Sequence, residues 1–280
     1  MQRIVIFGAG QSGRMIKNLL HGSCEPLAFI DNNHENYPVT IDGIPVISPK
    51  RLPEIEFDKI IVSVLNRDAA RDICGQLLNQ GVEKSSIFNI NDLREFIDIR
   101  LSVIRLLSDE IEKKGVKGSI AELGVYQGYI AKELNTLFKC RKLYLFDTFS
   151  GFDERDVIFE KAISKGDVFK KDFSDTSLEA VKKLMPHPES AIFCKGYFPD
   201  SAKDVSDSFA FVSIDADLYL PTLGGLRYFY PRLSKGGSIL IHDYNSTQFP
   251  NIRKAVDDFS KDFDIKIIPL SDLHGSAVIV

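Results

Sequence analysis

Short apolar runs alternate with helical patterns along the first 92 residues. Runs with the length and β-branched content of buried strands occupy residues 3–7, 27–30 and 59–65. Between them, apolar residues recur at helical spacing in RMIKNLL and in ARDICGQLLNQG. This alternation predicts a parallel sheet with crossover helices in a first domain that spans residues 1–92.

A single long helix is predicted over residues 93–115. Its apolar residues form one stripe, and Asn91 or Asp92 is a plausible N-cap. We expect a connecting helix whose apolar face covers either a domain or a second copy of the chain. The second arrangement would make the protein a homo-oligomer.

The alternation starts again in residues 116–280, which we interpret as a second α/β domain. Strands are predicted at SIAELGV, KLYLFDTF, AIFCKGYF, FAFVSID, SILIHDY, IKIIPL and SAVIV. Residues 150–175 are charged and aperiodic, and loops of this length are often functional, so we expect a mobile lid. Thr176 and Glu179 then have the spacing of a capping box at a helix start.

Composition and charge narrow the class of protein. Of the 280 residues, 44% are hydrophobic and 26% charged, as in ordinary globular proteins. The net charge of −4 gives no basic field for nucleic acid or an anionic membrane. No apolar run approaches the roughly 20 residues that span a bilayer, no signal peptide is visible, and the cysteines are scattered. We therefore expect a cytoplasmic protein with reduced thiols.

The first glycine-rich loop follows a predicted strand and enters a helix. Gly8, Gly10 and Gly13 have the dinucleotide-binding spacing, and Asp31 ends the next strand, where it could bond ribose hydroxyls. A turn that binds nothing, or binds another nucleotide, fits equally well. Since no tyrosine has a lysine four positions later, redox catalysis is not expected here.

A second loop has wider spacing, with Gly124 and Gly128 preceded by the acid Glu122. Asp147 ends the following strand. We interpret this set as a site for an adenosine-containing cofactor, in which Asp147 bonds the ribose and Glu122 faces a cationic part of the ligand. A packing turn beside a surface acid is the alternative.

Two acids, Asp215 and Asp217, end the apolar run FAFVSI. Ligands of open α/β sheets bind at the carboxyl ends of strands, and Asp243 ends the next predicted strand. A site is therefore favoured over a solvated turn. An Asp-x-Asp pair would also suit a metal-dependent glycosyltransferase, and a non-catalytic nucleotide or nucleotide-sugar sensor is a second alternative.

From about residue 100 the chain resembles the macrocin O-methyltransferase family of sugar methyltransferases. The resemblance rests on AELGVYQG, LYLFDTFSGF, KGYFPDSA, SIDADLYLPT, YPRLSKGGSILIHDY and RKAVDDF, in that order. It implies two Rossmann-like units in series, the second with the class I methyltransferase fold. It also implies methyl transfer from S-adenosylmethionine to a hydroxyl of a sugar or nucleotide-sugar, usually with Mg²⁺.

The resemblance also implies roles for individual residues. The cofactor would be lined by Glu122, Gly124, Tyr126, Gly128, Asp147, Thr148 and Gly196. Asp215 would bind the metal and act as base, with Asp243 as the second ligand. We expect Asp217 to lie behind these ligands or to face the substrate.

One departure is His242, where the family often has an acid next to the position of Asp243. Because Mg²⁺ prefers oxygen ligands, the imidazole could instead be the base, a ligand of a softer metal, or a structural residue. The first domain lies outside the family core. It resembles small Rossmann-type domains found beside sugar-modifying enzymes, which implies that it binds a nucleotide handle of the substrate.

Overall fold

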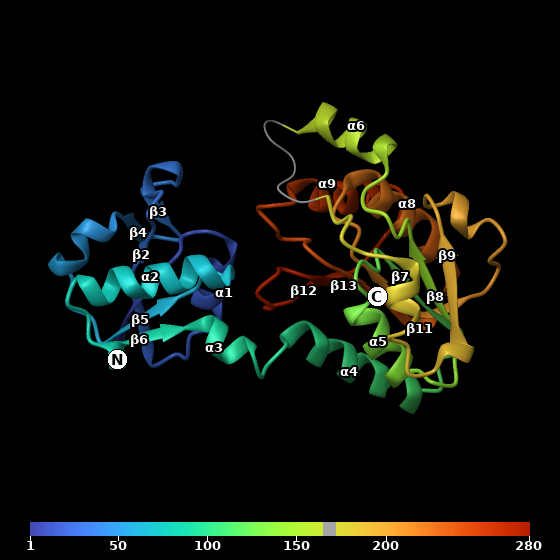
Figure 1. The fold of residues 1–280 in the computed structure, drawn as a ribbon, viewed down its shortest axis with the longest axis horizontal. Helices are drawn as coiled ribbons and strands as arrows, with labels where there is room; N and C mark the ends of the chain where they lie inside the picture. Colours follow the sequence, from blue (N-terminus) through green and yellow to red (C-terminus); the bar gives the residue numbers. More distant parts are fainter. Residues whose placement is uncertain (165–171) are drawn as a thin grey trace. The chain divides into compact units, whose positions relative to one another are not determined.

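A computed structural model describes residues 1–164 and 172–280 of the chain (Figure 1). The chain divides into two compact units. Unit 1 comprises residues 1–99 and 271–274, and unit 2 comprises residues 100–270 and 275–280. Two features of this division were not predicted. Helix α4 belongs to unit 2 instead of forming a separate connector, and four residues near the C-terminus belong to unit 1.

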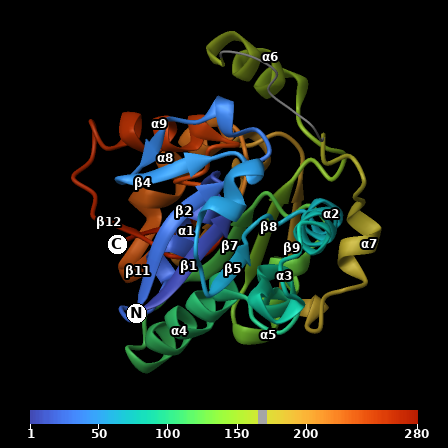
Figure 2. The same cartoon turned by 90° about the vertical axis from the view of Figure 1, so that its left-hand side faces the viewer.

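Unit 1 alternates strands and helices, as its apolar runs predict. Its elements are β1 (Gln2–Phe7), α1 (Gln11–Leu19), β2 (Cys24–Ile30), β3 (Thr40–Ile41), β4 (Ile44–Ile47), β5 (Lys59–Val62), α2 (Arg67–Asn79), β6 (Ile87–Asn89) and α3 (Ile90–Arg94). In the described residues the strands form one sheet in the order β3-β4-β2-β1-β5-β6, parallel except for the β3–β4 pair. Figure 2 shows β1 between β2 and β5.

Apolar side chains of unit 1 form a core on each face of its sheet. Alternate residues of β1 point to opposite faces, so Val5 and Phe7 pack with α2 while Ile4 and Ile6 pack with α1. Leu273, from the short segment near the C-terminus, joins the second of these cores and is 7% exposed. The core of unit 1 is therefore completed by a residue far away in the sequence.

Unit 2 has the larger sheet. Its elements are α4 (Ile99–Lys113), β7 (Ser119–Leu123), α5 (Tyr129–Leu137), β8 (Leu143–Asp147), α6 (Glu154–Ile163), α7 (Leu178–Lys182), β9 (Ala191–Lys195), β10 (Phe209–Ile214), α8 (Tyr219–Phe229), β11 (Leu233–Ile241), α9 (Pro250–Phe259), β12 (Ile267–Pro269) and β13 (Ala277–Ile279). Within the described ranges the strand order is β12-β13-β11-β10-β7-β8-β9, and only β13 pairs antiparallel to its neighbours.

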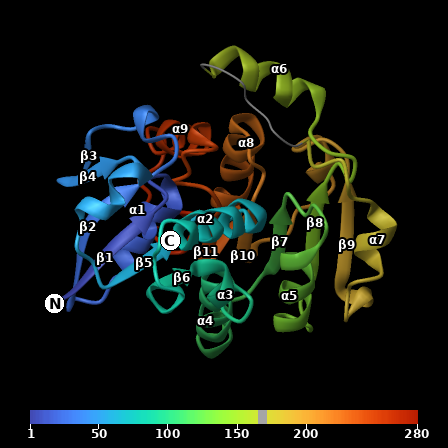
Figure 3. The same ribbon diagram turned by 60° about the vertical axis from the view of Figure 1, so that its left-hand side comes forward.

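Helices cover both faces of this sheet. Helices α8 and α9 pack on one face, and α4 and α5 pack on the other. Figure 3 shows β7, β8 and β9 side by side, and α6 lies on the outer side of α8. Because β10 is central, each of its residues is buried, which explains why all of them except Ser213 are apolar.

The predicted helix over residues 93–115 is instead two helices. Helix α3 is capped by Asn89, whose side chain accepts a hydrogen bond from the Asn91 amide, so neither Asn91 nor Asp92 is the N-cap. Helix α4 packs its apolar face on the sheet of unit 2, so that face covers a domain. The homo-oligomer stays a prediction.

The predicted capping box at Thr176 was wrong by one residue. Ser177 caps α7 and accepts a hydrogen bond from the Ala180 amide, while the Thr176 hydroxyl bonds the carbonyl of Tyr126. The predicted lid contains the ordered helix α6, and residues 165–171 of it lie outside the described residues. None of the described helices has the length and apolar character needed to span a bilayer.

Candidate active site

The predicted site residues of unit 2 follow the carboxyl ends of neighbouring parallel strands. Reading across the sheet, His242 and Asp243 follow β11, Asp215 follows β10, and Glu122 lies in β7. Asp147 then ends β8, and Gly196 follows β9. Since carboxyl ends of parallel strands share one edge of a sheet, the fold brings these residues to one place. Strands β10 and β11 are neighbours, so Asp215 and Asp243 lie on adjacent strand ends.

Gly124 lets two strand ends approach closely. Its φ is +85°, and a β-carbon at this position would lie 2.0 Å from the carbonyl oxygen of Asp215. The Asp215 amide also donates to the carbonyl of Leu123. Any larger residue at position 124 would therefore push the turn that carries Asp215 away from the glycine loop.

Asp147 holds the glycine loop in place. Its Oδ2 accepts hydrogen bonds from the amides of Val125 (2.7 Å) and Tyr126 (2.9 Å), and its Oδ1 accepts one from Phe149 (2.6 Å). Its carbonyl accepts from the Gly196 amide. Asp147 thus organises the loops after β7, β8 and β9, a structural role that the sequence did not indicate.

Glu122 is buried, with 2% of its surface exposed. Its Oε2 has no hydrogen-bond partner among the residues that the structure describes. Burial, together with the negative charges of Asp215 and Asp147, holds the pKa of Glu122 well above its usual value, although Arg100 opposes this. A buried polar atom without a partner is rare in folded proteins and calls for an explanation.

Asp215 is held between two basic side chains. Arg100, from the start of α4, lies 2.8 Å from Oδ2, and His242 Nδ1 lies 2.9 Å from Oδ1. The same Nδ1 is 2.7 Å from Oδ2 of Asp243. Arg100 and His242 therefore supply positive charge to an otherwise acidic cluster, and nothing in the sequence pattern indicated Arg100.

The charges of this cluster shift its pKa values in opposite directions. Burial alone would raise the pKa of Asp215, but the charges of His242 and Arg100 and their hydrogen bonds hold it below its ordinary value. Burial alone would lower the pKa of His242, but Asp215 and Asp243 outweigh it and raise this pKa to about 10. In this arrangement Asp215 is a carboxylate and His242 an imidazolium.

Asp217 lies in the same cluster, closer to the centre than the sequence suggested. Ligand atoms of Asp215, Asp217, His242 and Asp243 all lie within 4.8 Å of one another. Three carboxyl groups are a donor set that fits a divalent cation, and His242 can join them only after it loses its proton. Asp217 and Asp243 also have φ values of +58° and +57°, which side-chain-bearing residues rarely adopt.

Tyr126, Gly128 and Thr148 lie at the margin of the glycine loop. The Tyr126 hydroxyl donates to Asp175 (2.8 Å), and a β-carbon on Gly128 would lie 2.8 Å from Cγ1 of Val181. The Thr148 hydroxyl donates to the carbonyl of Gly151. The Tyr126 hydroxyl and Gly128 thus contact the segment after α6 and helix α7, whereas Thr148 bonds within the loop that precedes α6.

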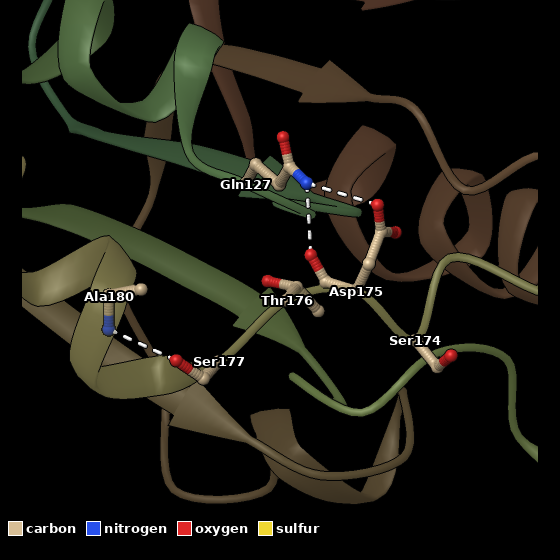
Figure 4. A pocket seen from close by; sticks show the side chains of 6 residues that line it. All are labelled: Gln127, Ser174, Asp175, Thr176, Ser177 and Ala180. Atoms are coloured by element: carbon tan, nitrogen blue, oxygen red, sulfur yellow. Dashed lines mark hydrogen bonds between the residues drawn. The ribbon is translucent and has the colours of Figure 1, made fainter.

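A cavity of about 400 Å³ lies beside this segment. It is lined by Gln127, Ser174, Asp175, Thr176, Ser177 and Ala180 (Figure 4). Gln127 Nε2 donates to the carbonyl of Asp175 at 2.9 Å and to its Oδ2 at 3.3 Å. These bonds fasten the segment to the glycine loop, and none of the acids at the strand ends lines this cavity.

In unit 1, as in unit 2, an acid at the end of a strand bonds an amide of a glycine loop. Asp31 follows β2, its Oδ2 accepts from the Ala9 amide (2.9 Å), and its Oδ1 accepts from the Asn33 amide (2.8 Å). Gly8 has a φ of +113°, and a β-carbon on Gly13 would lie 1.9 Å from the Gly8 carbonyl oxygen. The first and third glycines are thus required by backbone geometry and close packing alone.

Residues 97–279 match the family model described as macrocin O-methyltransferase (TylF). This match covers more than half of the chain. The chain belongs to the macrocin O-methyltransferase family. It is an S-adenosylmethionine-dependent O-methyltransferase, and the glycosyltransferase and sensor alternatives are set aside. Residues 1–88 match a second family model, described as C2185-like, N-terminal.

Individual relatives of this family member are distant. It is 25% identical over 186 residues to demethyldecarbamoylnovobiocin O-methyltransferase of Streptomyces niveus, covering 59% of this chain and 67% of the relative. It is 25% identical over 173 residues to mycinamicin III 3''-O-methyltransferase of Micromonospora griseorubida, covering 57% and 67%. A solved calicheamicin methyltransferase shares the fold, with a TM-score of 0.55, 18% identity, and coverage of 77% of this chain and 93% of that one.

Proposed function

We propose that this family member methylates a hydroxyl group of a sugar, carried by a nucleotide or by a glycoconjugate. The names of its relatives support a natural-product sugar or glycoside as acceptor. The observation that carries the proposal is the cluster of Asp215, His242 and Asp243 on adjoining strand ends. It lies beside the glycine loop, since Gly124 contacts the backbone of Asp215.

The methyl donor would bind along the ends of β7, β8 and β9. We assign the ribose to Asp147, whose Oδ1 accepts from one loop amide, that of Phe149, and can accept a further hydrogen bond. We assign a cationic part of the donor to Glu122, because a positive ligand group would satisfy its buried Oε2. Gly196 leaves open space, since a β-carbon there would meet nothing closer than 3.8 Å.

The acceptor hydroxyl would lose its proton to Asp215 as the methyl group is transferred. His242, held by Asp215 and Asp243, would orient this carboxylate, and Arg100 would keep it ionised. If a divalent cation binds, Asp215 and Asp243 would hold it, and it would lower the pKa of the bound hydroxyl. The donor set fits a cation, while His242 and Arg100 already provide part of the positive charge.

Donor binding can be tested with a matched pair of acids. Asp147→Asn replaces an acceptor of loop amides with a group that also donates, so we expect at least a tenfold loss of S-adenosylmethionine affinity by calorimetry. Asp31→Asn makes the same change in unit 1 and should leave that affinity unchanged. Equal affinities for both variants would contradict the assignment of the donor to unit 2.

Acceptor chemistry needs a wider screen. The full chain would be incubated with S-adenosylmethionine and dTDP-, UDP- and GDP-sugars or glycosides, and methylated products detected by mass spectrometry. Asp215→Asn should lower turnover by on the order of 10²–10⁴-fold. Loss of activity with EDTA and recovery with Mg²⁺ or Mn²⁺ would support the metal. Unchanged activity with EDTA, together with inactive His242→Asn, would make His242 the base.

Unit 1 is proposed to bind a nucleotide through Gly8, Gly10, Gly13 and Asp31. Arg14 supports this, because it lies one turn into α1 and its buried Nε has no hydrogen-bond partner in the described part of the chain. A guanidinium beside a helix N-terminus suits a phosphate. Calorimetry of the full chain with UDP, dTDP and NAD should show binding that Arg14→Gln weakens. If none of these nucleotides binds, the glycine loop of unit 1 has only a structural role.

A further inference from the structure

We infer that Glu160, in helix α6, is a positioning residue for methyl transfer because it fixes the turn that carries Asp215 and Asp217. This inference rests on the proposed use of that turn in catalysis. Glu160 is 3% exposed and is separated by more than fifty residues of sequence from the turn it holds. Its side-chain hydrogen bonds go to Tyr219 and Asn251 and not to either of the two acids.

Helix α8 begins without a cap of its own. Its N-cap is Leu218, which has no side-chain oxygen to bond the first amides, and no acidic residue lies in its first turn. Glu160 Oε2 accepts a hydrogen bond from the Tyr219 amide at 2.9 Å. A carboxylate from another helix therefore satisfies an orphan donor and meets the positive end of the helix dipole.

Glu160 is itself held from the other side. Its Oε1 accepts from Asn251 Nδ2 at 2.6 Å, and the same nitrogen donates to the Ser164 hydroxyl at 2.9 Å. The neighbouring Phe159 ring stacks on Tyr219 with centroids 5.5 Å apart. Figure 1 shows α6 above α8 and α9, so this carboxylate joins three helices of unit 2.

The turn between β10 and α8 is thus fixed at both ends. At its start, Gly124 packs against the backbone of Asp215. At its end, the Tyr219 amide is bound by Glu160, and between them Asp217 has a φ of +58°. Such a backbone is retained only where the surroundings hold it, so loss of the Glu160 bond should let Asp217 and its neighbours relax.

The test compares Glu160→Gln with an exposed control on the same helix, Glu154→Gln. A glutamine at position 160 cannot accept from both Tyr219 and Asn251, since one of its two polar atoms is a donor. A second change, Asn251→Asp, restores an acceptor opposite that donor. In the double variant the hydrogen bond between positions 160 and 251 is restored, with the new glutamine as donor and the new aspartate as acceptor.

With an acceptor that the wild type methylates, Glu160→Gln should lower kcat about 10- to 100-fold, because small misplacements of reacting groups are costly. The KM for S-adenosylmethionine should change less than about twofold, and Asn251→Asp should restore most of kcat. Glu154→Gln should match the wild type. Unchanged kcat in Glu160→Gln, or a thermal midpoint that recovers in the double variant without recovery of kcat, would overturn the inference.

A second readout needs no acceptor. In protein labelled with ¹³C at aspartate carboxyls, the Asp217 resonance should move in Glu160→Gln, return in the double variant, and stay in place in Glu154→Gln. An unmoved Asp217 resonance would overturn the inference. If the wild type methylates none of the acceptors, the proposed function fails while the resonance still decides the role of Glu160.

Discussion

At the scale of single residues, Asp217 and Asp243 combine two unusual states, a left-handed backbone and a place among like charges. Asp217 shows both: its φ is positive, and burial together with the charges of Asp215 and Asp243 raises its pKa well above its usual value. Features of this kind cost stability and gather at functional sites. Holding Asp217 in this state therefore costs the folded protein stability, which favours a functional role for this residue.

Asp217→Asn and Asp217→Ala should separate backbone strain from charge. Asparagine tolerates the left-handed conformation and alanine does not, so the alanine variant should be less stable by about 1 to 2 kcal/mol. Chemical denaturation measures this difference. Both variants should lose methyl transfer if the carboxylate itself is needed, whereas full activity in Asp217→Asn would show that only the turn matters.

Glu122→Gln should raise the stability of the protein and lower its affinity for the methyl donor. At neutral pH the variant should be more stable than the wild type, because it removes a buried carboxyl whose ionised form is disfavoured by burial and by Asp215 and Asp147. Affinity for S-adenosylmethionine should fall by about 10- to 100-fold, the cost of losing a charged hydrogen bond. Thermal unfolding and calorimetry measure the two effects, and a variant that binds normally would place the cationic group of the donor elsewhere.

The sequence could predict those candidate site residues that lie at the ends of strands. Glu122, Asp147, Asp215 and Asp243 were expected together because acids at the ends of buried parallel strands converge on one edge, and they lie at that edge. Arg100 and Glu160 were missed because each reaches its partner from a helix distant in the sequence, and no local pattern marks such a contact. The bonds from Asp147 to Val125 and Tyr126 were also missed, because they join two loops that are 22 and 21 residues apart in the sequence.

At the scale of elements, periodicity predicted the strands better than the helix ends. Buried runs such as β10 leave little choice of structure, because every residue must face a core. The prediction of one continuous helix over residues 93–115 was wrong, since an apolar stripe does not show where a helix is interrupted. The caps at Asn89 and Ser177 differ from the predicted ones because polar neighbours at such positions compete for the same amides.

Helix α6 should give stability a pH dependence. Burial raises the pKa of Asp156 from 3.8 to about 6, although the Tyr197 hydroxyl bonds its charged form. The folded state then binds this proton more tightly than the unfolded state, so its contribution is present below about pH 4 and is lost as pH rises through about 6.

Asp156→Asn removes this titration. Compared with the wild type, the variant should gain relative stability between about pH 4 and pH 6 and keep a constant advantage above that range. Thermal midpoints of both proteins across this range measure the difference. A difference that does not change with pH would mean that folding leaves the pKa of Asp156 at its ordinary value.

At the scale of the whole molecule, the chain passes from unit 1 to unit 2, returns for residues 271–274, and ends in unit 2. Leu273→Ala removes a buried residue of the unit 1 core and should cost about 2 to 5 kcal/mol. Hydrogen exchange should then rise in peptides of unit 1. Leu270→Ala, three residues earlier in unit 2, is the control and should affect the other set of peptides. The reverse pattern would contradict this assignment.

This path of the chain also limits how the gene can be recombined. Because Leu273 completes the core of unit 1 from the far end of the sequence, a crossover near residue 99 divides that core between two parents. A chimera that keeps unit 1 and takes its methyltransferase part from a relative would inherit a foreign residue in that position. Exchange between family members therefore succeeds only where the incoming segment also fits the place of Leu273, so the two units should be inherited together.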